Sequence, residues 1–288
     1  LKISFLIFLL GLLIFIKNKK INFLEFLKIK YIKYLVIVFF FIPMYLSQKY
    51  HEDFGYYHLP YALAFLEEKI IFGFANINPS YVYNSIWLNI NSIFFLNDKN
   101  FNFLTLPSFL LFLSFIIFSL HNILNLKRIK ISDYYLITLL FYFILKFTRI
   151  SEFGVDFPSV IFSTLGIYYF IKFYEIDSEI EKKSYFYLNL IFSVFAILVK
   201  LSVLPVILLP IFIYIKNFKI LKFYIFNPKF LFIYFFALIF FLQQFIYTGC
   251  FFFPTKLTCL DVSWFNNEYL KLPETLELIN KSYSVAKN

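Results

Sequence analysis

Charged residues are scarce in this sequence: Asp, Glu, Lys and Arg make up only 15% of its 288 residues, whereas a soluble domain usually carries about 25%. The chain holds two cysteines, which excludes a disulfide-rich secreted fold. It contains no C-x-x-C, H-E-x-x-H, P-loop or G-x-G-x-x-G pattern. The sequence therefore gives no support to a zinc protease, an ATPase or a nucleotide-sugar-binding Rossmann domain.

Apolar residues dominate instead. Hydrophobic residues make up 61% of the chain, and Phe, Tyr and Trp alone make up 25%. Such hydrophobicity excludes intrinsic disorder, and a soluble core of this size could not bury so much apolar surface. The composition predicts an all-α, polytopic transmembrane helical bundle.

Apolar runs near the length of a bilayer core mark the predicted spans. There are eight of them, at 2–16, 34–47, 103–120, 134–147, 157–174, 186–199, 201–215 and 230–247. The first could alternatively be a signal peptide. Lys200, Ser202 and Pro205 interrupt the nearly continuous pair 186–215, which predicts either a hairpin or a broken helix.

The net charge of +10 is distributed unevenly over the predicted topology. The loops after spans 1, 3, 5 and 7, counted together with Lys172 at the end of span 5, hold 16 basic and 6 acidic residues, whereas the opposite face holds 11 of each. The entire excess therefore lies on one face, which the positive-inside rule assigns to the cytoplasm. This distribution indicates topology and contact with anionic membrane lipids, not nucleic-acid binding.

The chain begins with Leu1 rather than Met and ends in a polar segment beyond the last span. We expect a fragment or an alternative start codon. The predicted organisation is a transmembrane domain over 1–247 and an extracytoplasmic tail over 248–288, truncated before further spans.

The long outer loop 48–102 carries the most polar chemistry. Two adjacent carboxylates, Glu52 and Asp53, lie immediately outside a span. Pro60 suits the first turn of a helix, which we expect to continue to about Glu68. A second helix is predicted over 81–96, lying at the membrane interface, because its apolar and polar residues fall on separate faces.

Several stretches of the sequence resemble a bacterial membrane-protein family within the GT-C superfamily of polytopic glycosyltransferases. The resemblance covers residues 35–266. The stretches that carry it are 53–60 (DFGYYHLP), 73–78 (GFANIN), 83–87 (YNSIW), 199–202 (VKLS), 248–254 (TGCFFFP) and 260–264 (LDVSW).

The resemblance implies an enzyme of the extracytoplasmic face that takes a sugar from a polyprenyl-phosphate donor, without a nucleotide cofactor. Asp53 is the expected general base, and Glu52 is its helper or, with Asp53, a ligand for a divalent metal. Asp156, in a later outer loop, is a further acidic candidate. Lys200 or Arg149 would bind the lipid phosphate. His58 and Tyr57 complete the expected substrate-binding residues.

Each of these residues also has a purely structural interpretation. The acidic pair could be solvated, Asp156 could cap a helix, Lys200 could extend to the interface, and His58 could serve packing. Tyr and Trp near span ends suit an aromatic belt, whereas Trp264 in the outer tail could stack on a sugar. Cys250 and Cys259 both lie outside, where an oxidising periplasm favours a disulfide over two free thiols.

Three functions compete at this stage: a membrane glycosyltransferase acting on an envelope glycan, lipid or protein, a transporter or flippase of lipid-linked saccharides, and a saccharide polymerase. Transport sites usually place charged residues within the membrane, whereas here they gather at one surface. A polymerase would be expected to use several outer arginines, but the chain has only Arg128 and Arg149. The sequence thus favours a multi-pass glycosyltransferase of the bacterial inner membrane, with lipids and the polyprenyl-phosphate sugar as partners.

Overall fold

The computed structural model describes residues 29–46, 54–67, 70–94, 103–126, 128–146, 154–253 and 255–265. Within these ranges the chain is helical and forms no β-strand, which confirms the predicted all-α class. The α-helices are α3 (Ile29–Leu46), α4 (Leu59–Glu67), α5 (Ile86–Ile93), α6 (Leu106–Leu124), α7 (Ile131–Leu145), α8 (Asp156–Tyr174), α9 (Glu179–Val199), α10 (Leu208–Lys216), α11 (Phe218–Leu221) and α12 (Leu231–Thr248).

Three helices in the described part are long and apolar enough to cross a bilayer: α6, α9, and α12 with the turn before it. A fourth crossing results if Leu201–Lys216 and Phe218–Phe226 form one span bent by 95°. α7 is apolar but has 15 residues, fewer than the roughly 20 that a span usually needs. Helices therefore occupy seven of the eight predicted positions, but three or four have the properties of a full crossing. The predicted span 2–16 lies outside the described residues.

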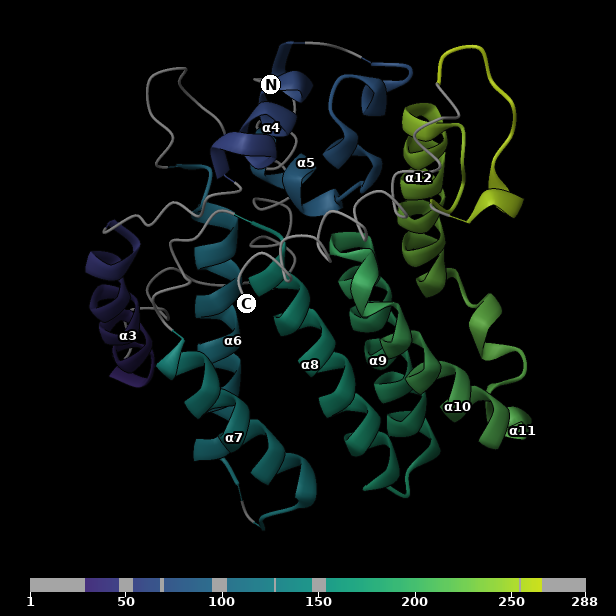
Figure 1. Cartoon of the computed structure of the whole chain (residues 1–288). Helices are drawn as coiled ribbons and strands as arrows, with labels where there is room; N and C mark the ends of the chain where they lie inside the picture. Colours follow the sequence, from purple (N-terminus) through teal and green to yellow (C-terminus); the bar gives the residue numbers. More distant parts are fainter. Residues whose placement is uncertain are drawn as a thin grey trace, which may run out of the picture.

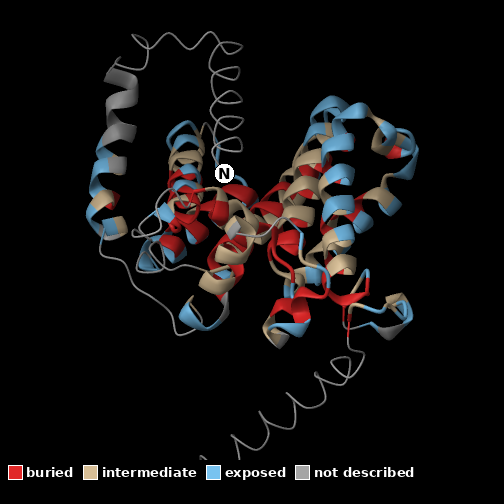
Figure 2. Cartoon of the chain, turned by 90° about the horizontal axis from the view of Figure 1, so that it is seen from above, coloured by how far each residue is buried: buried red, intermediate tan, exposed pale blue. Residues whose placement is uncertain are grey.

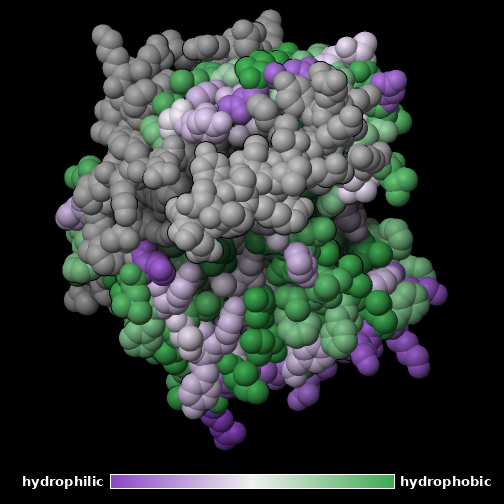
Figure 3. Space-filling view, viewed as in Figure 1, coloured by the Kyte–Doolittle hydropathy of each residue, from purple (hydrophilic) through white to green (hydrophobic). Residues whose placement is uncertain are grey.

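The long helices form a bundle that α4 and α5 cover at one end. Figure 1 shows α6, α8, α9 and α12 running along the bundle, with α4 and α5 above them; α5 contacts both α6 and α9. Viewed from above, buried residues gather where helices meet, and exposed residues lie on their outer sides (Figure 2). Apolar side chains are prominent in the lower half of the face in Figure 3, and hydrophilic ones gather along its lower edge. This distribution suits a bundle surrounded by lipid.

α8 and α9 form the closest helix pair, because a glycine lets their backbones approach. A Cβ atom placed on Gly166 would lie only 3.0 Å from Oγ of Ser193. At the same crossing, Nδ2 of Asn189 donates a hydrogen bond to the carbonyl oxygen of Gly166 over 2.8 Å. Small residues and interhelical hydrogen bonds are the usual means of holding helices together in lipid, where apolar surface alone gives little driving force.

Lys200 ends α9 and starts a hairpin. Its backbone is extended, with φ −148° and ψ 115°, and a 3₁₀ helix over Leu201–Ile207 contains Pro205. α10 then packs back along both α8 and α9. Of the two predicted possibilities for 186–215, the structure therefore forms the hairpin.

The outer loop forms both predicted helices, but the second is shorter and lies deeper than expected. Pro60 lies in the first turn of α4, as predicted. α5 covers only Ile86–Ile93 because Ser85 caps its start, accepting a hydrogen bond from the Trp87 amide. Trp87 is buried and donates from Nε1 to Oγ of Ser108 over 3.1 Å. The aromatic-belt interpretation therefore fails for Trp87, because its indole N–H has a protein partner inside the fold.

An ion cluster joins α7 to α8 at the lower end of the bundle. Nζ of Lys172, in the last turn of α8, lies 3.2 Å from Oδ1 of Asp133 and 3.9 Å from Oε2 of Glu175. Asp133 is almost fully buried, and it also accepts a hydrogen bond from the Lys130 amide. Glu175 accepts from the amide of Ser132 over 2.7 Å. Lys172 therefore compensates a buried carboxylate.

Candidate functional site

An ion pair between Asp156 and Lys200 marks the candidate site. Asp156 is the first residue of α8, and Lys200 directly follows α9. Because these helices are antiparallel neighbours, the two residues meet at the end of the bundle that carries α4 and α5. Nζ of Lys200 donates a hydrogen bond to Oδ1 of Asp156. The N-cap position of α8 is occupied by Val155, and Asp156 is the first residue inside the helix, so the helix-cap interpretation of Asp156 is wrong.

A cavity of about 330 Å³ contains this pair, within the range of about 300–1,000 Å³ that small-molecule pockets occupy. It is lined by Tyr142, Lys146, Asp156, Phe157, Ser159, Val160, Lys200, Ser202 and Val203. Two ammonium groups and one carboxylate give the lining a net charge of +1. The hydroxyl groups of Tyr142 and Ser202 add neutral hydrogen-bond donors, whereas the Ser159 hydroxyl already donates to the carbonyl oxygen of Asp156. This combination suits an anion that also presents oxygen acceptors, such as a phosphate.

Lys146 is the member of this cavity that the sequence analysis missed. It follows α7 directly and lies on the exposed surface. Among the described residues it has no ion-pair partner, whereas Lys200 is already paired with Asp156. The available signal was its place at the end of the predicted span 134–147, on the face that also carries Lys200.

The outer loop is tied to the same end of α9. Oγ of Ser85 donates a hydrogen bond to the carbonyl oxygen of Val199 over 2.7 Å. Val199 directly precedes Lys200, so this bond fixes the backbone from which the Lys200 side chain extends. His58 is buried, and a Cβ atom on Gly154 would lie 3.3 Å from its Cε1. His58 therefore packs close to the start of α8, but it does not line the cavity.

Four expected site groups cannot be placed beside this cavity. Asp53, Glu52 and Arg149 lie outside the described residues, as does the side chain of Tyr57. The predicted base, its helper and the alternative phosphate ligand therefore remain sequence-based predictions. In the described part of the chain, no three His, Cys, Asp or Glu residues come together as a metal site.

A buried polar network joins the outer loop to α12, centred on Asn84. Its Oδ1 accepts a hydrogen bond from the Tyr61 hydroxyl over 2.8 Å. Its Nδ2 lies 3.3 Å from both the carbonyl oxygen of Phe240 and Oε1 of Gln243. Burial raises the pKa of the Tyr61 phenol well above its ordinary value, and the neighbouring Tyr247 adds to the effect. Tyr61 thus stays protonated and serves as a donor.

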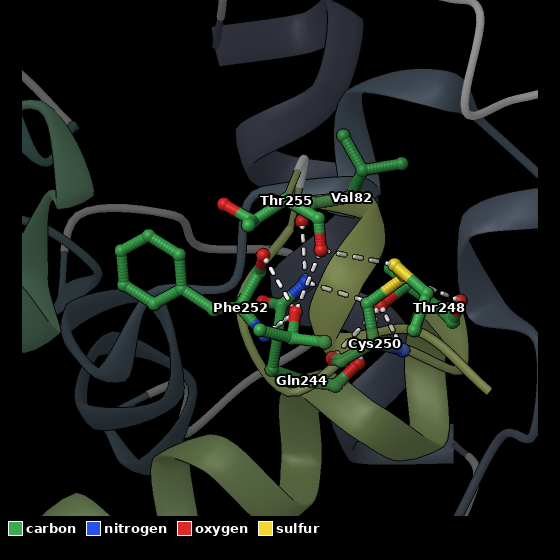
Figure 4. Close-up of a disulfide and its surroundings, with 8 residues drawn as sticks. Val82, Gln244, Thr248, Cys250, Phe252 and Thr255 are labelled. Atoms are coloured by element: carbon green, nitrogen blue, oxygen red, sulfur yellow. Dashed lines mark hydrogen bonds between the residues drawn. A yellow bond between two sulfur atoms is a disulfide. The ribbon is translucent and has the colours of Figure 1, made fainter.

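Cys250 and Cys259 form a disulfide beside this network, with an S–S distance of 2.10 Å and Cα atoms 3.8 Å apart. This Cα separation is shorter than the roughly 4.4–6.8 Å expected of most disulfides, and the two residues also form an antiparallel backbone bridge. Figure 4 shows the linked hairpin above the end of α12, where Nε2 of Gln244 donates to the carbonyl oxygen of Val82 over 2.7 Å. The hairpin therefore lies against the outer loop.

Trp264, the residue considered for sugar stacking, packs within this region. Its ring makes edge-on contacts with Phe72 and Phe245, at centroid distances of 5.3 and 6.0 Å. Its carbonyl oxygen accepts a hydrogen bond from Nδ2 of Asn76. Gly73 has a φ of +66°, and a Cβ atom there would clash with the same carbonyl oxygen. Trp264 therefore has a structural role in holding the tail on the outer loop.

Comparison with known proteins gives a family but no characterised relative. Neither a curated protein nor a solved structure matches the chain. A family described as a domain of unknown function, DUF8201, matches residues 1–286. Because this match covers nearly the whole sequence, the protein belongs to the DUF8201 family.

Proposed function

We propose that this protein is a multi-pass glycosyltransferase of the bacterial inner membrane, which transfers a sugar from a polyprenyl phosphate on the extracytoplasmic face. The observation that carries the proposal is the cavity in which Lys146 and Lys200 stand beside Asp156. Its two cations lie at the bundle end that the charge distribution assigns to the outside. A phosphate whose lipid chain remains in the bilayer would reach the protein at such a place.

The roles follow from the contacts. Lys200 and Lys146 bind the donor phosphate, and Asp156 holds the Lys200 ammonium in position through their hydrogen bond. During transfer, the acceptor hydroxyl oxygen forms a bond to the sugar anomeric carbon, and the bond from that carbon to the phosphate oxygen breaks. The leaving phosphate takes the electron pair, which the lysines stabilise. The hydroxyl proton goes to the carboxylate of Asp53.

The transporter alternative is less well supported by the charges in the helices. α6 and α12 contain no Asp, Glu, Lys or Arg, and in α8 and α9 every such residue lies near a helix end. Carriers of charged substrates usually place such residues near the middle of the membrane. A surface cavity with two lysines therefore suits a reaction at the interface better than passage across it.

The experiment separates binding from chemistry. Purified full-length protein in detergent is titrated with a fluorescent polyprenyl phosphate, the leaving group of the proposed reaction. Lys200→Met should weaken its binding about tenfold or more, because a charge-assisted hydrogen bond is lost. Lys219→Met removes an exposed charge from α11 at the other end of the bundle and is the matched control.

Chemistry is measured with a panel of radiolabelled polyprenyl-phosphate sugars and a membrane extract as acceptor. Asp53→Asn should lower transfer about a hundredfold or more, as loss of a general base does, without changing polyprenyl-phosphate binding. Equal binding by wild type and Lys200→Met would rule out the proposed phosphate site. Full transfer by Asp53→Asn would rule out its role as base.

A further inference from the structure

The chain bends sharply where α10 ends, at the end of the bundle far from the candidate site. Leu201–Lys216 and Phe218–Phe226 meet at an angle of 95°, with Asn217 between them. Beyond the bend, the side chains of Leu221 and Phe230 are buried in a cluster with residues of α8 and α9. The segment after the bend is therefore held on the bundle, and it runs across the direction of α10 rather than along it.

The bend segment, defined as residues 212–226, is strongly basic. It carries three exposed lysines: Lys216, Lys219 and Lys222. No Asp or Glu occurs in the sequence from 182 to 260, and none of the three lysines forms an ion pair within the described part of the chain. Nζ of Lys216 lies 5.8 Å from the ring centre of Phe212, and Nζ of Lys222 lies 5.0 Å from that of Phe223. A ring attracts a cation without neutralising its charge, so both ammonium groups remain able to bind an anion.

The same segment exposes large apolar side chains. Phe218, Phe223 and Phe226 are 47%, 74% and 76% exposed. Exposed aromatic rings beside lysines are typical of a segment in the plane of a membrane interface, where rings enter the acyl region and lysines extend to the headgroups. The charge distribution assigns this end of the bundle to the cytoplasmic leaflet.

We propose that the bend segment binds an anionic glycerophospholipid, with its phosphate against the ammonium groups of Lys216 and Lys222 and an acyl chain over Phe223 and Phe226. A zwitterionic phospholipid brings an ammonium or choline group of its own, which the lysines repel. Free phosphate or a nucleic acid would match the lysines but leave the rings in water. The proposal assigns to one segment a selectivity that a basic membrane face does not by itself require. It is independent of the proposed transferase activity, because it concerns the opposite end of the bundle.

The test uses the full-length protein in phosphatidylethanolamine vesicles with a trace of phosphatidylglycerol that carries a photoactivatable group in one acyl chain. After crosslinking, mass spectrometry of the peptides should find labels within 212–226. Lys216→Met combined with Lys222→Met should reduce this labelling about tenfold or more, because each lysine near the surface attracts an anionic lipid. Lys216→Arg combined with Lys222→Arg keeps both charges and should label like the wild type.

Lys182→Met combined with Lys183→Met is the matched control. It removes the same number of charges from the same predicted membrane face, but these lysines lie near the start of α9, whose first turn holds Glu179 and Glu181. This control should label 212–226 like the wild type. An equal loss of labelling in the two methionine pairs would mean that the general surface charge attracts the lipid, and it would overturn the proposed site. Loss of labelling in the arginine pair would overturn it as well.

Two measurements on the wild type identify the ligand, and they decide the question even if the methionine pair at Lys216 and Lys222 fails to fold. A phosphatidylcholine probe with the same photoactivatable chain should label 212–226 about tenfold less than the phosphatidylglycerol probe. Equal labelling by the two probes would overturn the proposal. Inorganic phosphate should compete no better than sodium chloride of equal ionic strength, and specific competition by phosphate would indicate a site for a soluble anion instead.

Discussion

Replacing Asn84 with alanine should detach the outer loop from α12. The substitution removes three side-chain hydrogen bonds, one from the Tyr61 hydroxyl at 2.8 Å and two longer ones from Nδ2 to α12 at 3.3 Å. The bond from the Asn84 amide to Oε1 of Gln244 involves the backbone and is retained. The energetic loss is therefore confined to the side chain.

The magnitude follows from burial. Asn84 is 3% exposed and Tyr61 1%, so water cannot replace the lost partner. A typical hydrogen bond contributes about 0.5–1.5 kcal/mol, and a buried polar group left without a partner costs about 1–3 kcal/mol. Because the two 3.3 Å bonds are weak, the expected loss in the free energy of unfolding is about 2–4 kcal/mol.

The assay is equilibrium unfolding in mixed micelles with increasing dodecyl sulfate, followed by circular dichroism. Asn125→Ala is the matched control, because Asn125 is exposed and its side chain bonds only within its own helix. It should change the free energy by less than about 0.5 kcal/mol. If Asn84→Ala unfolds at the same dodecyl sulfate fraction as Asn125→Ala, the network does not hold the loop, and the reasoning is refuted.

Three further predictions test other parts of the fold. Lys172→Ala should destabilise the protein by about 3–5 kcal/mol in the same assay, because Asp133 is left buried without its cation. Cys250→Ser should cost on the order of 2–3 kcal/mol, as expected for a bridge that closes a short loop. Single cysteines introduced into a cysteine-free background should react with an impermeant maleimide from outside intact cells at Ser80, and only after permeabilisation at Asn18, as the charge distribution predicts.

Each of these has its own contradicting outcome. Lys172→Ala should be compared with Lys219→Ala, which removes an exposed lysine, and equal stability of the two would mean that Asp133 does not need its partner. Wild type treated with a reductant should have the same free energy of unfolding as Cys250→Ser. Reduction without any loss of stability would contradict a stabilising disulfide. Labelling in the reverse pattern would invert the topology and remove the basis for an outer-face site.

Composition and hydropathy were sufficient to predict the all-α class of the protein and most helix positions. Hydropathy placed helices where α3, α6, α7 and α12 occur, because a run of apolar residues in lipid must satisfy its backbone hydrogen bonds within the helix. The lengths of the helices were less predictable than their positions. α5 begins later than the apolar pattern suggests, since the Ser85 cap ends the irregular segment before it.

The sequence also placed Asp156 and Lys200 on the same membrane face, because the order of the predicted spans puts the start of 157–174 and the end of 186–199 on one side. It did not predict their ion pair, which depends on how closely α8 and α9 pack at Gly166. The sequence also did not assign Lys146 to this cavity. Lys146 follows α7 and Lys200 follows α9, and only the folded chain brings the ends of these two helices to one cavity.

The tertiary structure alone decided which polar residues are buried. Asn84 and Trp87 belong to a polar, aromatic stretch typical of an interface, but each has a partner from a distant segment and lies inside the fold. Hydrophobic periodicity is a local property of the chain, and it indicates which face of a helix avoids water. The hydrogen bond that allows a polar side chain to be buried comes from another helix, and the structure specifies it only when the two segments meet.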